Sequence, residues 1–260
     1  MFRRKGSIEI KSADQLAVMR EAGRVVGVTL QAVAAAVRPG VSTAELNDIA
    51  AASISDHGAT PSFLGYHGFP GVICTSINSE VVHGIPGSAI LRLGDLLSID
   101  CGAIVDGWHG DAAISIAVGS VSPSVLELSA ATEEAMWAGL RAAQVGAHLS
   151  DIGHAVESML RARGAYGNVE DYGGHGIGSR MHMDPHVANF GSPGGGPVLV
   201  PGMALAIEPM ATLGDPEVMV LADGWTVVTV DGQWAAHWEH TVAITDDGPW
   251  VLTAVDDTLL

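Results

Sequence analysis

Two aspartates lie in segments that otherwise look like buried β-strands. The sequence SIDCGAIVDGWHGDAAISIAV carries Asp100 and Asp111 among isoleucine, valine, alanine, cysteine and glycine. Asp106-Gly107 is a preferred two-residue hairpin turn, and the resulting register places Asp111 opposite Gly102. Asp100 then shares that face of the hairpin, at about 7–8 Å from Asp111 between Cα atoms. The two carboxylates are therefore predicted to reach one ionic site.

A bound cation would explain why two acidic side chains converge in an apolar setting. Two bare carboxylates there repel each other, and one of them tends to take up a proton. The alternative is that one aspartate caps the turn or faces solvent, and for an isolated hairpin the two interpretations are equally good. Further ligands elsewhere in the chain would favour the cation.

Other side chains that can bind a metal occur at three more places. His175 and His182 lie in the glycine-rich segment GGHGIGSRMHMDP, where the backbone lets an imidazole project into a cleft. Glu208 ends the apolar segment ALAIEPM, and Glu239 begins another in HWEHTVAIT. Taken singly, a glutamate before proline is ordinarily a strand end, and a histidine in a glycine loop is ordinarily structural.

The combined set is rich in oxygen and contains one nitrogen ligand: Asp100, Asp111, His175, Glu208 and Glu239. Such a set suits two hard or borderline divalent ions bridged by carboxylates better than it suits one structural zinc ion. The sequence has no H-E-x-x-H motif, so a thermolysin-like zinc site is not supported.

The elements that must position these residues show an internal repeat. The segment Arg38–Ala59 aligns without gaps with Gln144–Ala165, and Gly40 then matches Gly146. Each copy predicts a turn, a helix start, an apolar helical period and a terminating glycine. The predicted N-cap regions are Ser42-Thr43 in the first copy and Ser150 with Asp151 in the second. A helix-like stretch precedes each copy, Ala13–Val37 and Pro123–Val145.

Strand-like segments follow each pair of helices, separated by Gly, Pro and Asp-Gly turns. They are Val72–Ser76, Leu96–Val118, Ala204–Pro209, Val218–Val230 and Trp234–Thr245. The order of helices then strands, twice, predicts an α+β fold with helices on one face of an antiparallel sheet. We expect a single domain over residues 1–260, with similar halves at about 12–120 and 121–250.

Composition excludes several classes of function. The 260 residues are 48% apolar and 16% charged, which is typical of a packed globular chain. The 12 basic and 29 acidic residues leave a net charge of −17, which disfavours direct binding to nucleic acid or anionic membranes. No apolar run has the length of a membrane span or a signal peptide, so a cytoplasmic protein is expected. Cys74 and Cys101 are expected to be reduced and packed.

These residues resemble the type I methionine aminopeptidases, which are metallopeptidases of the "pita-bread" fold. The resemblance runs from about Ala13 to about Thr253. Its strongest pieces are six ordered blocks: PSFLGYHGFP, SINSEVVHGIP, SIDCGA with WHGDAA, GGHGIG with MHMDP, AIEPM and WEHTV. The implied fold has two pseudo-symmetric halves of helices packed on a curved antiparallel sheet, in agreement with the repeat.

The resemblance implies a role for each candidate ligand. Asp100 corresponds to a chelating ligand, and Asp111 and Glu239 correspond to acids that bridge two metal ions. His175 and Glu208 correspond to ligands that complete the other ion, and Glu208 also to a general acid/base. His83 and His182 correspond to histidines that touch the substrate and act in catalysis without binding metal.

A methionine side chain would need an apolar slot. The resemblance assigns this slot to six residues, which are Phe63, Tyr66, Phe69, Cys74, Met181 and Trp225. Two of them depart from the commonest bacterial pattern, since Phe63 stands where cysteine is frequent and Met181 where phenylalanine is frequent. Both keep the slot apolar and leave its width open. Taken without the metal ligands, these side chains would be interpreted as core.

The implied activity is removal of the N-terminal methionine from nascent polypeptides whose second residue is small. It would use two divalent ions per subunit, of Co, Mn, Fe or Zn, to activate the attacking water. The expected protein is a cytoplasmic monomer whose substrates emerge at the ribosome.

Two alternatives stay open. An X-Pro aminopeptidase or prolidase shares the fold and the ligand pattern, but usually carries a large extra N-terminal domain for which this chain has no room. A non-enzymatic binding protein can use the same scaffold when the metal ligands are lost, and here all five ligand types are present.

Overall fold

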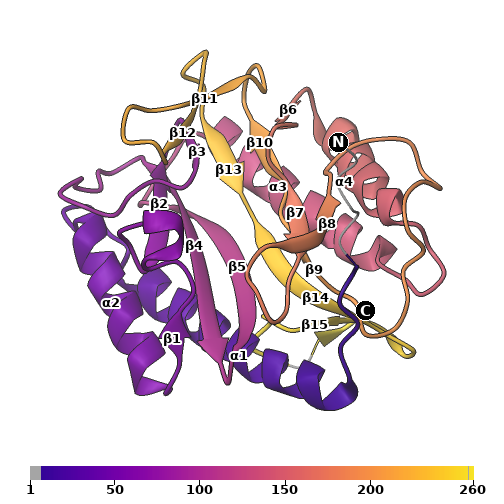
Figure 1. Ribbon diagram of the computed structural model, residues 1–260. Coiled ribbons are helices and arrows are strands. Elements are labelled where there is room, and N and C mark those ends of the chain that lie inside the picture. Colours follow the sequence, from indigo (N-terminus) through magenta and orange to yellow (C-terminus); the bar gives the residue numbers. More distant parts are fainter. Residues whose placement is uncertain (1–6, 257) are drawn as a thin grey trace.

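Helices and a curved sheet form two layers in this protein (Figure 1). The computed structural model describes residues 7–256 and 258–260. Within those residues, four α-helices and one short 3-10 helix are present: α1 (Ala13–Ala36), α2 (Thr43–Asp56), α3 (Pro123–Ala142), α4 (Leu149–Arg163) and η1 (Tyr66–Gly68). The helix α1 packs on strands β4 (Leu96–Val105) and β5 (Trp108–Ala117), whereas α3 packs on β13 (Ala235–His237) and β14 (Glu239–Thr245). The α+β arrangement predicted from the sequence is therefore confirmed.

The main sheet has ten strands within the described part of the chain, and every pairing in it is antiparallel. Its central path runs β1-β4-β5-β14-β9-β7-β8. The strands are β1 (Thr60–Pro61), β2 (Ile73–Ile77), β4 (Leu96–Val105), β5 (Trp108–Ala117), β7 (Gly174–Gly176), β8 (Met183–Val187), β9 (Ala204–Ile207), β14 (Glu239–Thr245), β15 (Gly248–Val251) and β16 (Thr258–Leu259). Strands of the two sequence halves meet where β5 pairs with β14.

Two smaller sheets of three strands each flank the main one. The first has the order β13 (Ala235–His237), β10 (Met210–Thr212), β6 (Gly167–Asn168). The second has the order β11 (Val218–Val220), β12 (Val227–Thr229), β3 (Glu80–Val82). The segment expected as one strand over Trp234–Thr245 is thus two strands, β13 and β14, which belong to different sheets.

The hairpin of β4 and β5 has the predicted register. Val105 pairs with Trp108 across the turn, and Gly102 pairs with Asp111. The turn residues Asp106 and Gly107 both have positive φ, 47° and 81°, as a tight two-residue turn requires. Turn chemistry and alternation are local properties, which is why sequence alone predicts this pairing.

Capping side chains define where three of the helices begin. Ser12 and Gln15 form a reciprocal capping box at the start of α1. Ser42 and Glu45 do the same for α2. Such pairs satisfy backbone N–H groups that the first helical turn leaves without partners. In α4 the N-cap is His148, whose N–H donates to Asp151 at 2.7 Å.

One sequence-based expectation for α4 was wrong. Ser150 was expected to belong to the N-cap region, but it lies inside the first turn of the helix. Its Oγ accepts a hydrogen bond from the N–H of Gly195 at 2.7 Å instead. The hydroxyl of Ser150 is thus used by the loop at Gly195, and the N-cap is His148, two residues earlier.

The repeat extends to backbone conformation. Gly40 and Gly146 precede α2 and α4 with φ of 92° and 85°, values that glycine adopts without strain. Isolated bridges pair Ser42 with Ile90 and His148 with Val198 at the corresponding helix starts. Equivalent turns therefore lead into equivalent helices in the two halves.

Each helix pair covers its own hydrophobic cluster on the sheet. Leu128 and Leu140 of α3 are fully buried with Ile207 of β9 in one cluster. Val26 of α1 packs with Ile99 of β4 in the other. Burying one such side chain stabilises the fold by about 1.5–3 kcal/mol.

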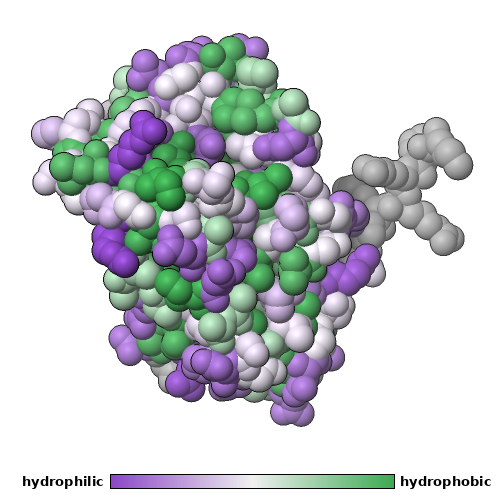
Figure 2. Space-filling model, turned by 90° about the vertical axis from the view of Figure 1, so that its left-hand side faces the viewer, coloured by the Kyte–Doolittle hydropathy of each residue, from purple (hydrophilic) through white to green (hydrophobic). Residues whose placement is uncertain are grey.

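The protein surface carries no concentrated apolar face in the view of Figure 2, where hydrophobic and hydrophilic residues are interspersed. Among the described residues, no helix combines the length and apolar character that crossing a membrane would require. Cys74 and Cys101 are buried free thiols, as expected from the sequence.

Candidate active site

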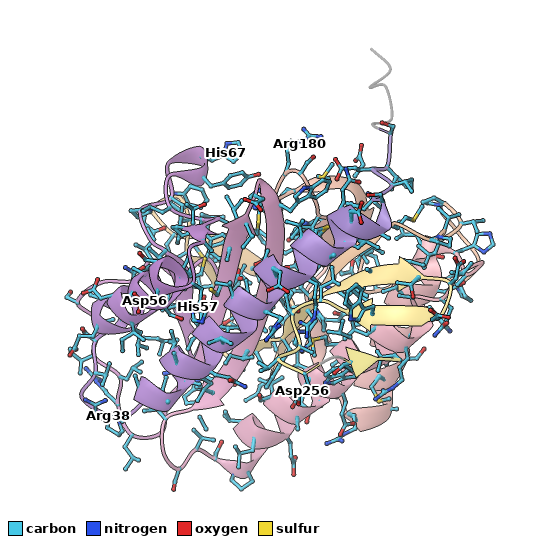
Figure 3. The ribbon with its side chains drawn as sticks, turned by 90° about the horizontal axis from the view of Figure 1, so that it is seen from below. Arg38, Asp56, His57, His67, Arg180 and Asp256 are labelled. Carbon is cyan, nitrogen blue, oxygen red and sulfur yellow. The ribbon has the colours of Figure 1, made fainter. Side chains whose placement is uncertain are left out.

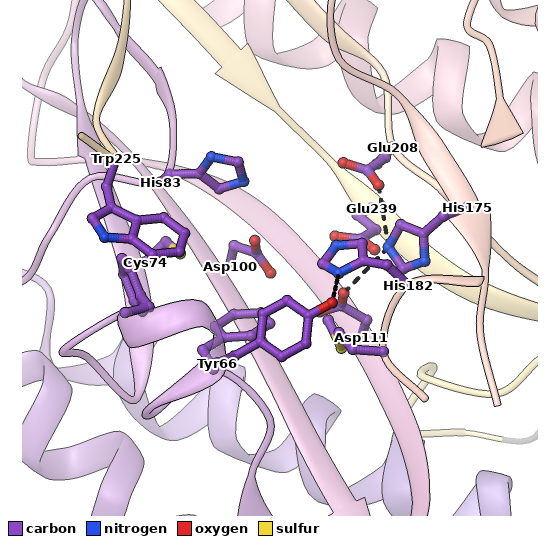
Figure 4. A pocket seen from close by; sticks show the side chains of 13 residues that line it. Tyr66, Cys74, His83, Asp100, Asp111, His175, His182, Glu208, Trp225 and Glu239 are labelled. Atoms are coloured by element: carbon purple, nitrogen blue, oxygen red, sulfur yellow. Dashed lines mark hydrogen bonds and ion pairs between the residues drawn. The ribbon is translucent and has the colours of Figure 1, made fainter. Parts of the chain in front are cut away.

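All thirteen residues singled out from the sequence line one cavity (Figure 4). They are Phe63, Tyr66, Phe69, Cys74, His83, Asp100, Asp111, His175, Met181, His182, Glu208, Trp225 and Glu239. In Figure 4, His83 and Trp225 lie on one side of Asp100, and His175 and Glu208 lie on the other. The cavity thus has an apolar end and an end lined by acids and imidazoles.

Strand register brings three acids onto one face of the sheet. Asp111 pairs with Gly102, and Asp100 lies two positions from Gly102 on β4. Ala113 pairs with Asp100 on one side and with Glu239 on the other. Directly paired residues share a face, as do residues two apart on one strand. The hairpin and β14 therefore aim all three carboxylates into the cavity.

Two further ligands come from the second half of the chain. His175 lies on β7 and pairs with Ala206 of β9. Glu208 follows the end of β9, two positions beyond Ala206, and precedes Pro209. Because proline has no N–H to donate, the strand ends there and the glutamate side chain is left at the sheet end, facing the cavity.

The β5 and β14 strands are held together next to the acids by a threonine. The Asp111 N–H donates to Thr241 Oγ1 at 3.1 Å. The Thr241 hydroxyl donates to the Asp111 carbonyl at 2.8 Å. This reciprocal pair fixes the backbone of Asp111 relative to Glu239, two positions before Thr241.

His175 presents one nitrogen to the acids. Its Nε2 lies 3.6 Å from Glu208 Oε1 and 3.8 Å from Asp111 Oδ2. Its Nδ1 lies 3.0 Å from the Gly176 carbonyl, to which an Nδ1–H donates. Burial lowers the pKa of His175 to about 3. The ring is therefore neutral, with the Nε2 lone pair directed at the carboxylates, as metal coordination requires.

Sequence reasoning missed one residue of this centre, His237. It is only 1% exposed, at the end of β13. Its Nε2 lies 3.7 Å from Glu208 Oε2 and 3.9 Å from Glu239 Oε2. The available signal was the H-x-E spacing in HWEHTV, which places two residues of an extended segment on the same side.

The four carboxylates create a large electrostatic cost if they are left alone. Burial raises the pKa of Asp100 to about 7. Burial, followed by repulsion from Glu239, Asp100 and Glu208, raises the pKa of Asp111 well above its usual value. The pKa values of Glu208 and Glu239 are raised for the same reasons. A cation between the carboxylates would offset both their mutual repulsion and the cost of burying their charge.

Several polar atoms at this centre also lack a partner within the described residues. Asp100 Oδ1, Asp111 Oδ1, Glu239 Oε1 and His237 Nε2 are buried without a hydrogen bond. Buried polar atoms in native proteins are nearly always paired. Two groups have ligand atoms close enough to surround an ion: Asp111, His175 and Glu239; and Glu208, His237 and Glu239. The residues present therefore fit divalent metal ions.

The opposite end of the cavity is apolar. Phe63, Phe69, Cys74 and Met181 are buried in one hydrophobic cluster, with Trp225 packed against it. The rings of Phe69 and Trp225 meet edge to face, at 5.1 Å between centroids. This end can accept a linear apolar side chain, and aromatic edges favour contact with sulfur.

Two further histidines line the cavity, His182 near the acidic end and His83 near the apolar end. The ring of His182 lies 4.3 Å from that of His175 at an interplanar angle of 54°, and it shares a hydrogen bond of 2.9 Å with the Tyr66 hydroxyl. His83 has a positive φ of 61° and contacts the ring of Trp225 at 6.4 Å. Burial lowers the pKa of His83 to about 4, and burial also lowers the pKa of His182. Both rings are neutral at pH 7 and can donate one hydrogen bond each.

An outer hollow adjoins this cavity and shares Tyr66, Met181 and His182 with it. Its other lining residues include His67 and Arg180. Figure 3 shows these two side chains at one edge of the molecule, pointing outward. A peptide whose first residue occupies the inner cavity can therefore extend through the outer hollow toward solvent.

Comparison with known proteins gives a consistent result. A profile of metallopeptidase family M24 matches residues 17–246. Methionine aminopeptidase 1 of Mycobacterium tuberculosis is 55% identical to the chain over 249 residues, with 94% of each protein covered. The crystal structure of methionine aminopeptidase from Thermotoga maritima superposes with a TM-score of 0.93 at 38% identity, covering 95% of this chain and 100% of that one. The prolidase from Pyrococcus furiosus, at 22% identity and a TM-score of 0.76, shares the fold, and this chain covers 66% of it.

Proposed function

Because this chain belongs to metallopeptidase family M24, we propose that it is a methionine aminopeptidase, a metal-dependent hydrolase that removes N-terminal methionine from polypeptides. The fold is the pita-bread arrangement implied by the sequence resemblance. One observation carries the proposal: a cluster of four carboxylates, of which Asp111 and Glu239 are buried, lies with His175 in the same cavity as an apolar slot lined by aromatic rings.

The metal centre would consist of two divalent ions. Asp100, Asp111, His175, Glu208 and Glu239 would hold them, with Asp111 and Glu239 shared between the ions. When bound, such ions supply a nucleophilic water at neutral pH and polarise the scissile carbonyl. The oxygen-rich ligand set is compatible with Mn(II), Fe(II), Co(II) and Zn(II).

Three side chains would carry out the proton and hydrogen-bond steps. His182 would donate to the oxygen of the tetrahedral intermediate, since its neutral ring lies beside His175 and is oriented by Tyr66. His83 would hydrogen-bond the peptide nitrogen. Glu208 would take the proton from the attacking water and pass it to the leaving amine.

Specificity would come from the apolar end of the cavity. The slot formed by Phe63, Phe69, Cys74, Met181 and Trp225 would accept the methionine thioether, with Tyr66 at its entrance. The bulk of Phe63 and Met181 would keep the slot narrow. A small second residue would fit where the chain turns from the inner cavity into the outer hollow, and this turn would limit the reaction to N-terminal residues.

The same proposal includes the protein's setting. The whole chain would form one catalytic domain with two pseudo-symmetric halves, acting as a monomer in the cytoplasm. Its substrates would be nascent polypeptides near the ribosome. The net charge of −17 supports an enzyme that meets polypeptides without binding nucleic acid itself.

A peptidase assay tests the proposal directly. The protein, stripped by a chelator and then supplied with Mn(II) or Co(II), should cleave Met-Ala-Ser, and chelation should abolish the activity. Asp111→Asn should lower kcat at least 100-fold, while the exposed Asp48→Asn serves as the matched control. Preferential cleavage of X-Pro peptides would favour the prolidase alternative. A parent protein that binds no divalent ion would favour a non-enzymatic binding protein.

A further inference from the structure

His237 is a buried imidazole that the five-ligand centre does not use. It is 1% exposed, and its Nε2 has no hydrogen-bond partner among the residues that the structure describes. The atom points at Glu208 Oε2 and Glu239 Oε2. A nitrogen that is both buried and unpaired is costly unless it binds something.

The distances around His237 are those of ligands around a common ion rather than of hydrogen bonds. They are 3.7 Å to Glu208 and 3.9 Å to Glu239, too long for an N–H···O bond. Two ligand atoms, each about 2.1 Å from one ion, lie about 3.0–3.9 Å apart for bond angles of about 90–135°. The separations at His237 fall within this range.

His237 and His175 stand in matching positions about Glu208. His175 Nε2 lies 3.6 Å from Glu208 Oε1, and His237 Nε2 lies 3.7 Å from Glu208 Oε2. Both rings are almost completely enclosed, and each forms a group of three potential ligand atoms with Glu239. One carboxylate thus has an imidazole nitrogen beside each of its oxygens.

We propose that His237 is a sixth metal ligand, so that the two-ion centre has two imidazole nitrogens. His237 would coordinate an ion that Glu208 and Glu239 also hold, at the Glu208 oxygen that does not face His175. This inference rests on the proposed metal centre and extends it. Since imidazole suits Fe, Co and Zn better than Mn, the second nitrogen would shift the metal preference of its ion away from Mn(II).

The neighbouring His240 provides a matched control. It lies three residues further along, in β14, where its Nδ1 is bonded to Thr253 Oγ1 at 2.7 Å and its ring packs on Trp137. It does not line the cavity. A substitution there tests the general effect of losing a part-buried histidine from β14.

The experiment is proton NMR of the full chain loaded with two equivalents of Co(II), with calorimetric titration of the metal. A histidine bound to Co(II) gives a strongly shifted, solvent-exchangeable N–H signal. The parent should show two such signals. His237→Gln should retain only one and bind Co(II) at least tenfold more weakly, whereas His240→Gln should retain both. His175→Gln identifies the other signal.

The outcomes separate this inference from the proposed function. A parent that takes up two ions and cleaves Met-Ala-Ser, yet shows one shifted N–H signal, would refute a metal-binding role for His237 and leave the aminopeptidase intact. A parent that takes up no Co(II) would refute both. The count of signals in the parent decides the question even if His237→Gln fails to fold.

Discussion

Replacing Asp100 by asparagine should stabilise the metal-free protein above pH 7, although it removes a proposed metal ligand. Burial raises the pKa of Asp100 from 3.8 to about 7. The folded metal-free protein therefore binds a proton that the unfolded chain releases near pH 4. As pH rises from about 4 to 7, the folded state must either keep a proton that the unfolded chain releases or carry a buried charge. The free energy of unfolding therefore falls over this pH range. Asparagine has a similar shape and does not ionise.

The size of the effect follows from the two pKa values. A carboxyl group with a pKa of about 7 in the folded state and 3.8 in the unfolded state lowers the free energy of unfolding by about 4 kcal/mol at pH 8. The stabilisation by Asp100→Asn should thus be near zero at pH 3 and approach about 4 kcal/mol at pH 8. In urea, this corresponds to a rise in the unfolding midpoint of about 1 M.

Urea unfolding of chelator-treated protein between pH 5 and 8 measures this difference, with Asp48→Asn as the control at an exposed position. Adding Mn(II) or Co(II) should reverse the order, because the parent keeps all five proposed ligands and so gains more stabilisation from bound metal. An Asp100→Asn variant that is no more stable than the parent at pH 8 without metal would refute the reasoning. It would mean that the carboxylate is not destabilised by its surroundings.

Three further predictions concern packing and metal. Gly102→Ala should destabilise the protein by about 1–3 kcal/mol and raise KM for Met-Ala-Ser, because the added methyl would lie 2.8 Å from Ser62 Cβ and 2.9 Å from Phe63 Cε1. An unchanged Tm and KM would contradict this, because they would mean that Ser62 and Phe63 move aside at no cost. Leu128→Ala, at a fully buried position, should cost about 2–5 kcal/mol in thermal unfolding while kcat per folded molecule stays the same, and a matching loss of kcat would contradict a purely structural role. Calorimetry should show a Tm that rises with metal, since a concentration 100 times Kd adds about 2.7 kcal/mol; a Tm that no divalent ion changes would speak against a buried metal centre.

Features encoded by neighbouring residues could be read from the sequence. The Asp106-Gly107 turn and the alternation on both sides of it determine the hairpin register, so the convergence of Asp100 and Asp111 was predictable. The N-cap of α2 at Ser42 was predictable for the same reason, because its capping partner Glu45 is three residues away. The residues of the apolar slot, such as Phe63 and Trp225, could be assigned to the cavity only through the resemblance to a family.

Only the tertiary structure decided what surrounds those local elements. Glu208 and His237 lie on different strands, and their approach depends on the pairing of β9 with β14 in one sheet and of β10 with β13 in another. Likewise, the hydroxyl of Ser150 does not cap α4, because it accepts a hydrogen bond from Gly195 in a loop distant in sequence. Turns, caps and alternation depend on a few adjacent residues, whereas the partner of a buried imidazole depends on strand pairings across the whole sheet. The amino-acid sequence therefore specifies which groups face the cavity from each hairpin, and the folded sheet determines which of them meet.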